Sequence, residues 1–128
     1  MTTGDDLADL KIVMKEFIAD LRHIFTSNDE QRDLLIMQLF FERMSSERIM
    51  HNMINKVLPH AHIIEVRDSK YFIEHDSIFQ ALPRSRSKHY KEFWSGTGGK
   101  SLSNNDKQAI WAYFDTIIEI VKSYKKIN

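Results

Sequence analysis

Large apolar side chains recur at steps of three and four residues in two long stretches, one near each end of the chain. In an α-helix this spacing places the side chains on one face, whereas a strand would need alternation at every second residue. The spacing predicts one helix from about residue 5 to 25 and another that begins after Ser103. The repeating positions are Leu7, Leu10, Met14, Phe17, Leu21 and Ile24, then Ile110, Phe114, Ile117, Val121 and Tyr124.

A capping signal opens the segment between these two helices. Ser27 precedes Glu30 by three residues, which is the spacing of a capping box at a helix start. Apolar residues then cover most of the helix circumference as far as Met44, so we expect this helix to be the central and most buried one. Beyond Ser45 and Ser46 the helical spacing resumes and continues until Pro59.

Residues 60–83 fit two structures. A short β-hairpin near residues 62–74 is one interpretation, with Arg67-Asp68-Ser69-Lys70 as its polar turn. Two short helical turns, the second capped by Asp68, are the other, and we favour them. A brief helix that begins at Asp76 and ends before Pro83 follows in either case.

The fold expected from these patterns is all-α, a compact bundle of four to five helices, with a small β-hairpin near residues 62–74 as the alternative to helical turns in that segment. The chain has 128 residues, of which 42% are hydrophobic. A chain of this length buries about two-thirds of its unfolded surface, enough for an independent core. We therefore expect residues 1–128 to form a single helical domain.

Residues 84–101 are expected to form a long basic, glycine-rich loop. They hold five basic residues and one acidic residue, and three of the four glycines of the chain. Cationic groups neutralise phosphates, and aromatic rings stack on unpaired bases, so this segment is the candidate for binding a protein partner or nucleic acid. The candidate residues are Arg84, Arg86, Lys88, Tyr90, Lys91, Trp94 and Lys100.

Patterns that would indicate an enzyme are weak. The chain has no cysteine, which excludes thiol catalysis, disulfides and cysteine-ligated metals. The run Gly98-Gly99-Lys100-Ser101 imitates the end of a phosphate-binding loop, but Trp94 stands where the first glycine is required. His60 and His62 are two residues apart, a spacing that shares a face only on an extended chain. We predict no catalytic residues, no metal and no cofactor.

The overall charge argues against a membrane partner. Acidic and basic residues balance at 18 each, so no bulk positive charge would attract the chain to a lipid surface. No apolar run approaches the roughly 20 residues that a transmembrane helix needs. We expect a protein that works inside a cell, in the cytoplasm or nucleus.

Four segments, read in order, carry a family resemblance: residues 16–25, 71–83, 90–94 and 109–121. A helix ending in Phe25, the Leu82-Pro83 pair, Trp94 and the Ile110-Trp111 start of a closing helix together resemble small, uncharacterised helical proteins of nucleocytoplasmic large DNA viruses. The resemblance implies an intracellular viral protein and favours helix over hairpin in the middle. It implies no activity, and the basic interval before Trp94 departs from the pattern.

The function that we expect is a non-enzymatic intracellular protein-interaction module, with self-association into a homodimer as one form of it. Small bundles without catalytic or cofactor motifs are more often binding proteins than enzymes. Recognition would use an apolar or aromatic patch near Tyr90 and Trp94, rimmed by charge. The alternative is a nucleic-acid-associated factor that binds phosphates through the basic-aromatic loop 84–101.

Overall fold

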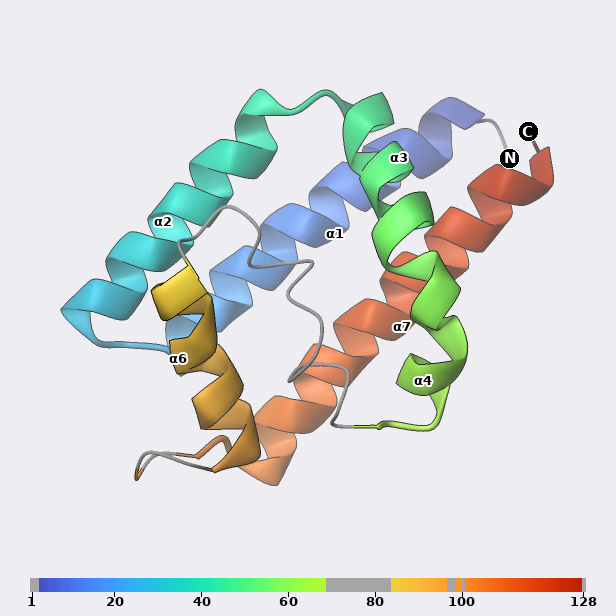
Figure 1. Cartoon of the computed structure of the whole chain (residues 1–128). Coiled ribbons are helices and arrows are strands. Elements are labelled where there is room, and N and C mark those ends of the chain that lie inside the picture. The colour runs from blue at the N-terminus through green and yellow to red at the C-terminus, as the bar shows by residue number, and fades with distance from the viewer. Residues whose placement is uncertain (1–2, 69–83, 97–98, 100, 128) are drawn as a thin grey trace.

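The computed structural model describes residues 3–68, 84–96, 99 and 101–127, and the described residues form helices joined by short turns (Figure 1). No strand occurs among these residues. In chain order the elements are α1 (Thr3–Ile24), α2 (Asn28–Arg43), α3 (Ser46–Lys56), the 3-10 helix η1 (Leu58–His60), α4 (Ala61–Glu65), α6 (Arg84–Ser95) and α7 (Asn104–Ile127). The prediction of an all-α bundle is confirmed at this level.

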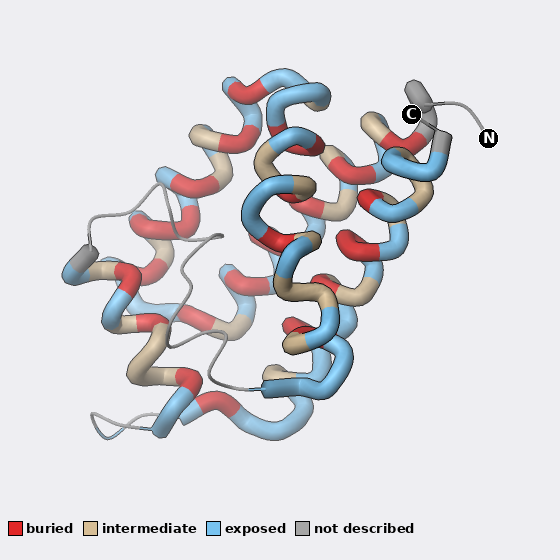
Figure 2. Tube along the Cα trace, turned by 45° about the vertical axis from the view of Figure 1, so that its right-hand side comes forward, coloured by how far each residue is buried: buried red, intermediate tan, exposed pale blue. Residues whose placement is uncertain are grey.

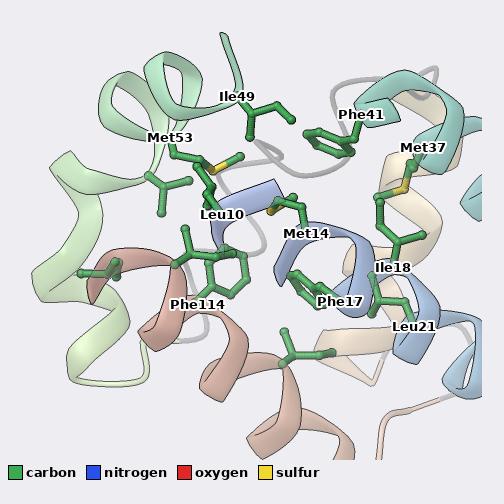
Figure 3. Close-up of a cluster of buried hydrophobic side chains, with 14 of the residues drawn as sticks. Leu10, Met14, Phe17, Ile18, Leu21, Met37, Phe41, Ile49, Met53 and Phe114 are labelled. Atoms are coloured by element: carbon green, nitrogen blue, oxygen red, sulfur yellow. The ribbon is translucent and has the colours of Figure 1, made fainter. Parts of the chain in front are cut away.

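Helix α1 is the centre of the bundle. It packs against α7, α2 and α3. Figure 1 shows that α1 and α7 run antiparallel, with the start of α1 close to the end of α7. In the core, the Phe17 ring stacks on Tyr113 at 4.7 Å between ring centroids and meets the edge of Phe114 at 5.7 Å. Figure 3 shows that side chains of α1 lie between those of α2, α3 and α7. The two helices predicted from the terminal spacing thus form the main packing interface.

Side-chain caps set the boundaries around α2. Ser27 and Glu30 form the predicted capping box, in which the Ser27 hydroxyl accepts from the Glu30 backbone and the Glu30 carboxylate accepts from the Ser27 backbone. Ser45 caps α3 by accepting from the Arg48 backbone N–H. The second cap explains why the helical pattern breaks between Met44 and Ser46 although apolar residues continue on both sides.

The interpretation of residues 62–74 as a β-hairpin is wrong for residues 62–68, the part that the structure describes. Residues 61–65 form α4, and Arg67 then turns the chain with a positive φ of 56°. The Arg67 guanidinium donates two hydrogen bonds, of 2.8 and 2.6 Å, to the Asp115 carboxylate and so ties this turn to α7. The second half of the hairpin and the brief helix predicted after Asp76 lie outside the described residues.

Two further expectations need correction. Residues 84–95 form the helix α6 instead of the first part of a loop. The central helix is α1 and not α2, because α1 packs against α7, α2 and α3, whereas α2 buries only one of its two apolar faces. Figure 2 shows buried and exposed residues alternating along each long helix, as expected for helices with a single buried face.

Candidate interaction surface

Helix α6 exists because three of its residues form a buried face. Ser87, Tyr90 and Trp94 follow at steps of three and four, and they are 2%, 3% and 4% exposed. The Tyr90 ring meets the edge of Phe25 at 4.9 Å between centroids, and the Trp94 ring meets Trp111 at 5.4 Å. The sequence does not show this helical spacing clearly, because the first buried position is a serine and the residues around it are basic.

A buried carboxylate holds α6 against α2. Asp33 is 5% exposed, and its Oδ2 accepts hydrogen bonds from Arg86 Nε at 2.9 Å and Nη2 at 2.7 Å. The Tyr90 hydroxyl donates to the same oxygen at 2.7 Å. Burial raises the pKa of Tyr90 well above its usual value, and the hydrogen bond to Asp33 raises it further. The hydrogen bond to Asp33 also raises the pKa of Arg86, so Tyr90 stays neutral and Arg86 charged.

A second contact between these helices starts from the capping box. Glu30 Oε2 lies 2.7 Å from His89 Nε2, while Oε1 of the same carboxylate accepts from the Ser27 backbone. Burial tends to raise the pKa of Glu30, but the hydrogen bonds from His89 and Ser27 together outweigh it and hold that pKa below its usual value. The Glu30 carboxylate therefore both completes the cap of α2 and holds α6 against α2 through His89.

These contacts change the interpretation of the seven candidate residues. Tyr90 and Trp94 are buried in the bundle, so the prediction that they form an exposed patch or stack on bases is wrong. Arg86 is paired with Asp33. Lys88 is exposed and Lys91 is half-buried, and their binding role stays a prediction. The side chain of Arg84 and the whole of Lys100 lie outside the described residues.

The outward face of α2 is exposed, although the apolar residues of this helix favour a core position from sequence alone. Leu35, Ile36 and Leu39 are 45%, 42% and 41% exposed, and they lie next to one another because their spacing is one, three and four residues. Arg32 and Arg43 are exposed at the two ends of this stripe. We call the five residues Arg32, Leu35, Ile36, Leu39 and Arg43 the α2 stripe.

A groove continues the α2 stripe toward α3. It is open, has a volume of about 400 Å³, and is lined by Ile36, Leu39, Phe40, Arg43, Met44 and Arg48. The groove lies where the helix is interrupted at Ser45. There α3 leaves the end of α2 in a new direction, and part of the Phe40 side chain is exposed between the two helices. The ion pairs found among the described residues involve neither Arg43 nor Arg48, so both guanidinium groups are available at the rim.

Among the residues that the structure describes, two other large apolar side chains are exposed, but each stands apart. Ile12 on α1 is 54% exposed and has the charged residues Lys11 and Asp9 close to it in sequence. Val66, at the end of α4, is 59% exposed. Single exposed apolar residues are normal on protein surfaces, whereas a contiguous patch marks a binding site. The α2 stripe is therefore the candidate surface, and Ile12 and Val66 serve as controls for it.

The structure offers no comparable arrangement for a metal. Within residues 3–68 and the later described segments, no three histidine or acidic side chains gather as metal ligands would. The His51 ring instead lies 2.9 Å from the Asn55 amide one turn further along α3. None of the helices found in the described parts of the chain is both long and apolar enough to cross a bilayer.

Comparison with models of known protein families, with curated proteins and with solved structures finds no match to this chain. The resemblance to small helical proteins of large DNA viruses therefore stays a prediction.

Proposed function

We propose that this chain is a non-enzymatic protein-interaction module whose recognition surface is the α2 stripe and the groove beside it. The observation that supports the proposal is the contiguous exposure of Leu35, Ile36 and Leu39 on a helix whose opposite face is fully packed. Exposing a contiguous apolar patch to water costs free energy, and such patches commonly mark the surfaces that a partner covers.

The energetics favour a partner of protein character. Complete burial of a leucine or isoleucine contributes about 1.5–3 kcal/mol, so covering the exposed part of the three side chains contributes about 1 kcal/mol each. Arginine is enriched in protein interfaces, where its long side chain packs while its guanidinium forms fork-shaped hydrogen bonds. Arg32 and Arg43 at the ends of the stripe, and Arg48 beyond it, supply such groups.

The shape favours an α-helix as the bound element. Leu35, Ile36 and Leu39 lie along one side of α2, and the groove at its end is open. An amphipathic helix laid against such a surface presents apolar residues at steps of three and four, which match the ridges of α2. The partner expected is a protein helix with one apolar face and charges at its edges.

Comparative capture from cells that naturally express the protein tests the proposal. Three baits are compared after nuclease treatment: the unchanged chain, Leu39→Glu, and the matched control Ile12→Glu, which places the same charge at an exposed apolar position on another helix. We expect the unchanged and control baits to retain a common partner that Leu39→Glu loses. If all three baits retain the same proteins, or none retains any, the α2 stripe is not the recognition surface.

A further inference from the structure

The charges on α2 deepen the proposed function by pointing to one partner, and this step rests on that function. Asp29 and Arg32 are exposed near the start of the helix, and Glu42 and Arg43 are exposed near its end. Each end of the helix therefore carries one exposed acid and one exposed base, and Glu42, on the side of α2 toward α1, also accepts a hydrogen bond of 3.1 Å from Gln38. We infer that the partner is a second copy of this chain, which pairs its own α2 antiparallel against the first.

The register of such a pair follows from the spacing. In a two-fold symmetric contact, residue i meets residue j and residue j meets residue i. Asp29 and Arg43 each lie seven residues from Ile36 (36 − 29 = 7 and 43 − 36 = 7). A two-fold axis beside Ile36 therefore places Asp29 opposite Arg43 of the second copy at both ends, and brings the two Ile36 side chains together at the centre.

Asp29, Ile36 and Arg43 follow one edge of the outward face of α2, and the residues along its other edge can also pair with their equivalents in a second copy. Leu35 and Leu39 lie symmetrically about position 37, and Arg32 and Glu42 lie symmetrically about the same position. An antiparallel pair therefore places Leu35 against Leu39 and Arg32 against Glu42 of the second copy. The one-residue offset between the two edges equals about 1.5 Å along the axis, which a modest tilt between packed helices accommodates.

Charge distinguishes a second copy from an acidic partner. A helix that carried only acids would satisfy Arg32 and Arg43 but would leave Asp29 and Glu42 facing like charges, which costs free energy at an interface. A second copy satisfies all four groups with one arrangement. The same four residues disfavour a parallel pair, since that would set each acid beside its own equivalent and each base beside its own equivalent.

The pair is expected to be reversible. Standard stable interfaces cover about 800 Å² on each partner, and α2 has 16 residues with one outward face. A surface of that size supports association that is lost on dilution. Phe40, which is half-buried and lines the adjoining groove, enlarges the contact if the α2–α3 corner of each copy reaches over the other.

Disulfide formation tests the register directly, because the chain contains no cysteine of its own. Ile36→Cys places one thiol at the proposed axis, where the two copies bring equivalent side chains within bonding reach. Ile12→Cys is the matched control, at an apolar position of similar exposure on α1. Circular dichroism of both variants checks that the helices are retained.

With oxidised glutathione as oxidant, we expect Ile36→Cys to form a covalent dimer at least about tenfold faster than Ile12→Cys, because pairing holds the thiols at an effective concentration far above that of the free protein. Equal rates for the two variants would overturn the inference.

A charge exchange supplies an independent readout. Asp29→Arg and Arg43→Asp each create two like-charge contacts in a pair with themselves, but a mixture of the two restores two opposite-charge contacts. Sedimentation velocity is therefore expected to show weaker association for each variant alone and recovered association for the mixture. If the mixture associates no better than its separate components, the antiparallel register is wrong.

Failure of this inference is distinguishable from failure of the proposed function. If neither the crosslinking nor the mixing experiment shows pairing, while Leu39→Glu still loses a captured protein, the second copy is excluded and the recognition surface stands. If capture is unchanged as well, both are excluded.

Discussion

Asp33 brings a negative charge into the contact between α2 and α6, where both of its partners come from α6. Arg86 and the Tyr90 hydroxyl donate to one carboxylate oxygen, and Asp33 itself is almost fully buried. A buried carboxylate without partners is strongly disfavoured. The three groups therefore form one unit that stabilises the bundle only when α6 is docked.

We predict that Asp33→Ala lowers the free energy of unfolding by about 2–3 kcal/mol, less than the loss of a fully buried ion pair because Arg86 stays partly exposed. A double-mutant cycle of Asp33→Ala with Tyr90→Phe, measured by urea denaturation, should give a coupling free energy of about 1–2 kcal/mol. Asp9→Ala, at an exposed position on α1, is the control. Additive effects of the two substitutions would contradict the hydrogen-bond assignment.

Glu30 makes stability depend on acidity. Its pKa in the folded protein lies below the ordinary value of 4.5, because the hydrogen bonds from His89 and Ser27 outweigh the effect of burial. A lowered folded pKa contributes stability that is fully present above pH 4.5 and is lost as the pH falls through the folded pKa. Glu30→Gln keeps a side-chain oxygen that can accept from the Ser27 backbone N–H, but the amide is neutral and takes up no proton as the pH falls.

We therefore expect the Glu30→Gln variant to be less stable than the unchanged chain at neutral pH and to show a smaller loss of stability between pH 5 and pH 3. Thermal unfolding followed by circular dichroism across this range measures both. Parallel curves for the two proteins would show that Glu30 does not contribute to the acid dependence.

At the scale of elements, α2 has two apolar faces with different roles. Leu34 lies on the face that packs on α1 and is fully buried, whereas Leu39 lies on the outward face and is 41% exposed. We predict that Leu34→Ala costs about 2–5 kcal/mol, in the range for buried leucines, and that Leu39→Ala costs less than about 1 kcal/mol. Urea denaturation at low protein concentration compares them, and equal losses would contradict the assignment of the faces.

The helices predicted from sequence were those whose signals are local. The spacing of Leu10, Met14 and Phe17 predicted α1, and the Ser27–Glu30 capping box predicted where α2 begins. Ser103 was expected to open the last helix, and its hydroxyl accepts from the Asp106 backbone N–H at 3.1 Å. Periodicity and caps depend on residues within a few positions of each other, so the sequence carries them directly.

The features that were missed depend on contacts between distant residues. Helix α6 carries Ser87 and Arg86 where an apolar pattern would be expected, and Arg86 is accommodated because Asp33 lies 53 residues earlier in the chain. The sequence pattern favours a core position for the outward face of α2, because an apolar residue on a helix does not reveal which side a neighbouring helix will cover. Leu35 and Ile36 could be placed on the surface only once the position of α1 was known.

At the scale of the whole molecule, packing and recognition use separate surfaces. The helices α1, α3 and α7 and the inner face of α2 form the shared core, and α6 is held to α2 by the buried carboxylates of α2. The only contiguous set of large apolar side chains exposed in the described part of the chain remains on the outer side of α2. Association through that side leaves the core and the α2–α6 contact unchanged, so it needs no rearrangement of the fold.

Solution NMR of the isotope-labelled chain over a concentration series tests this division most directly. We predict that amide and methyl signals of Leu35, Ile36 and Leu39 shift progressively as the protein is concentrated, while those of Ile12 and Val66 stay constant. Shifts confined to the helix of residues 84–95, or no change on α2 at any concentration, would contradict recognition through the α2 stripe by a second copy.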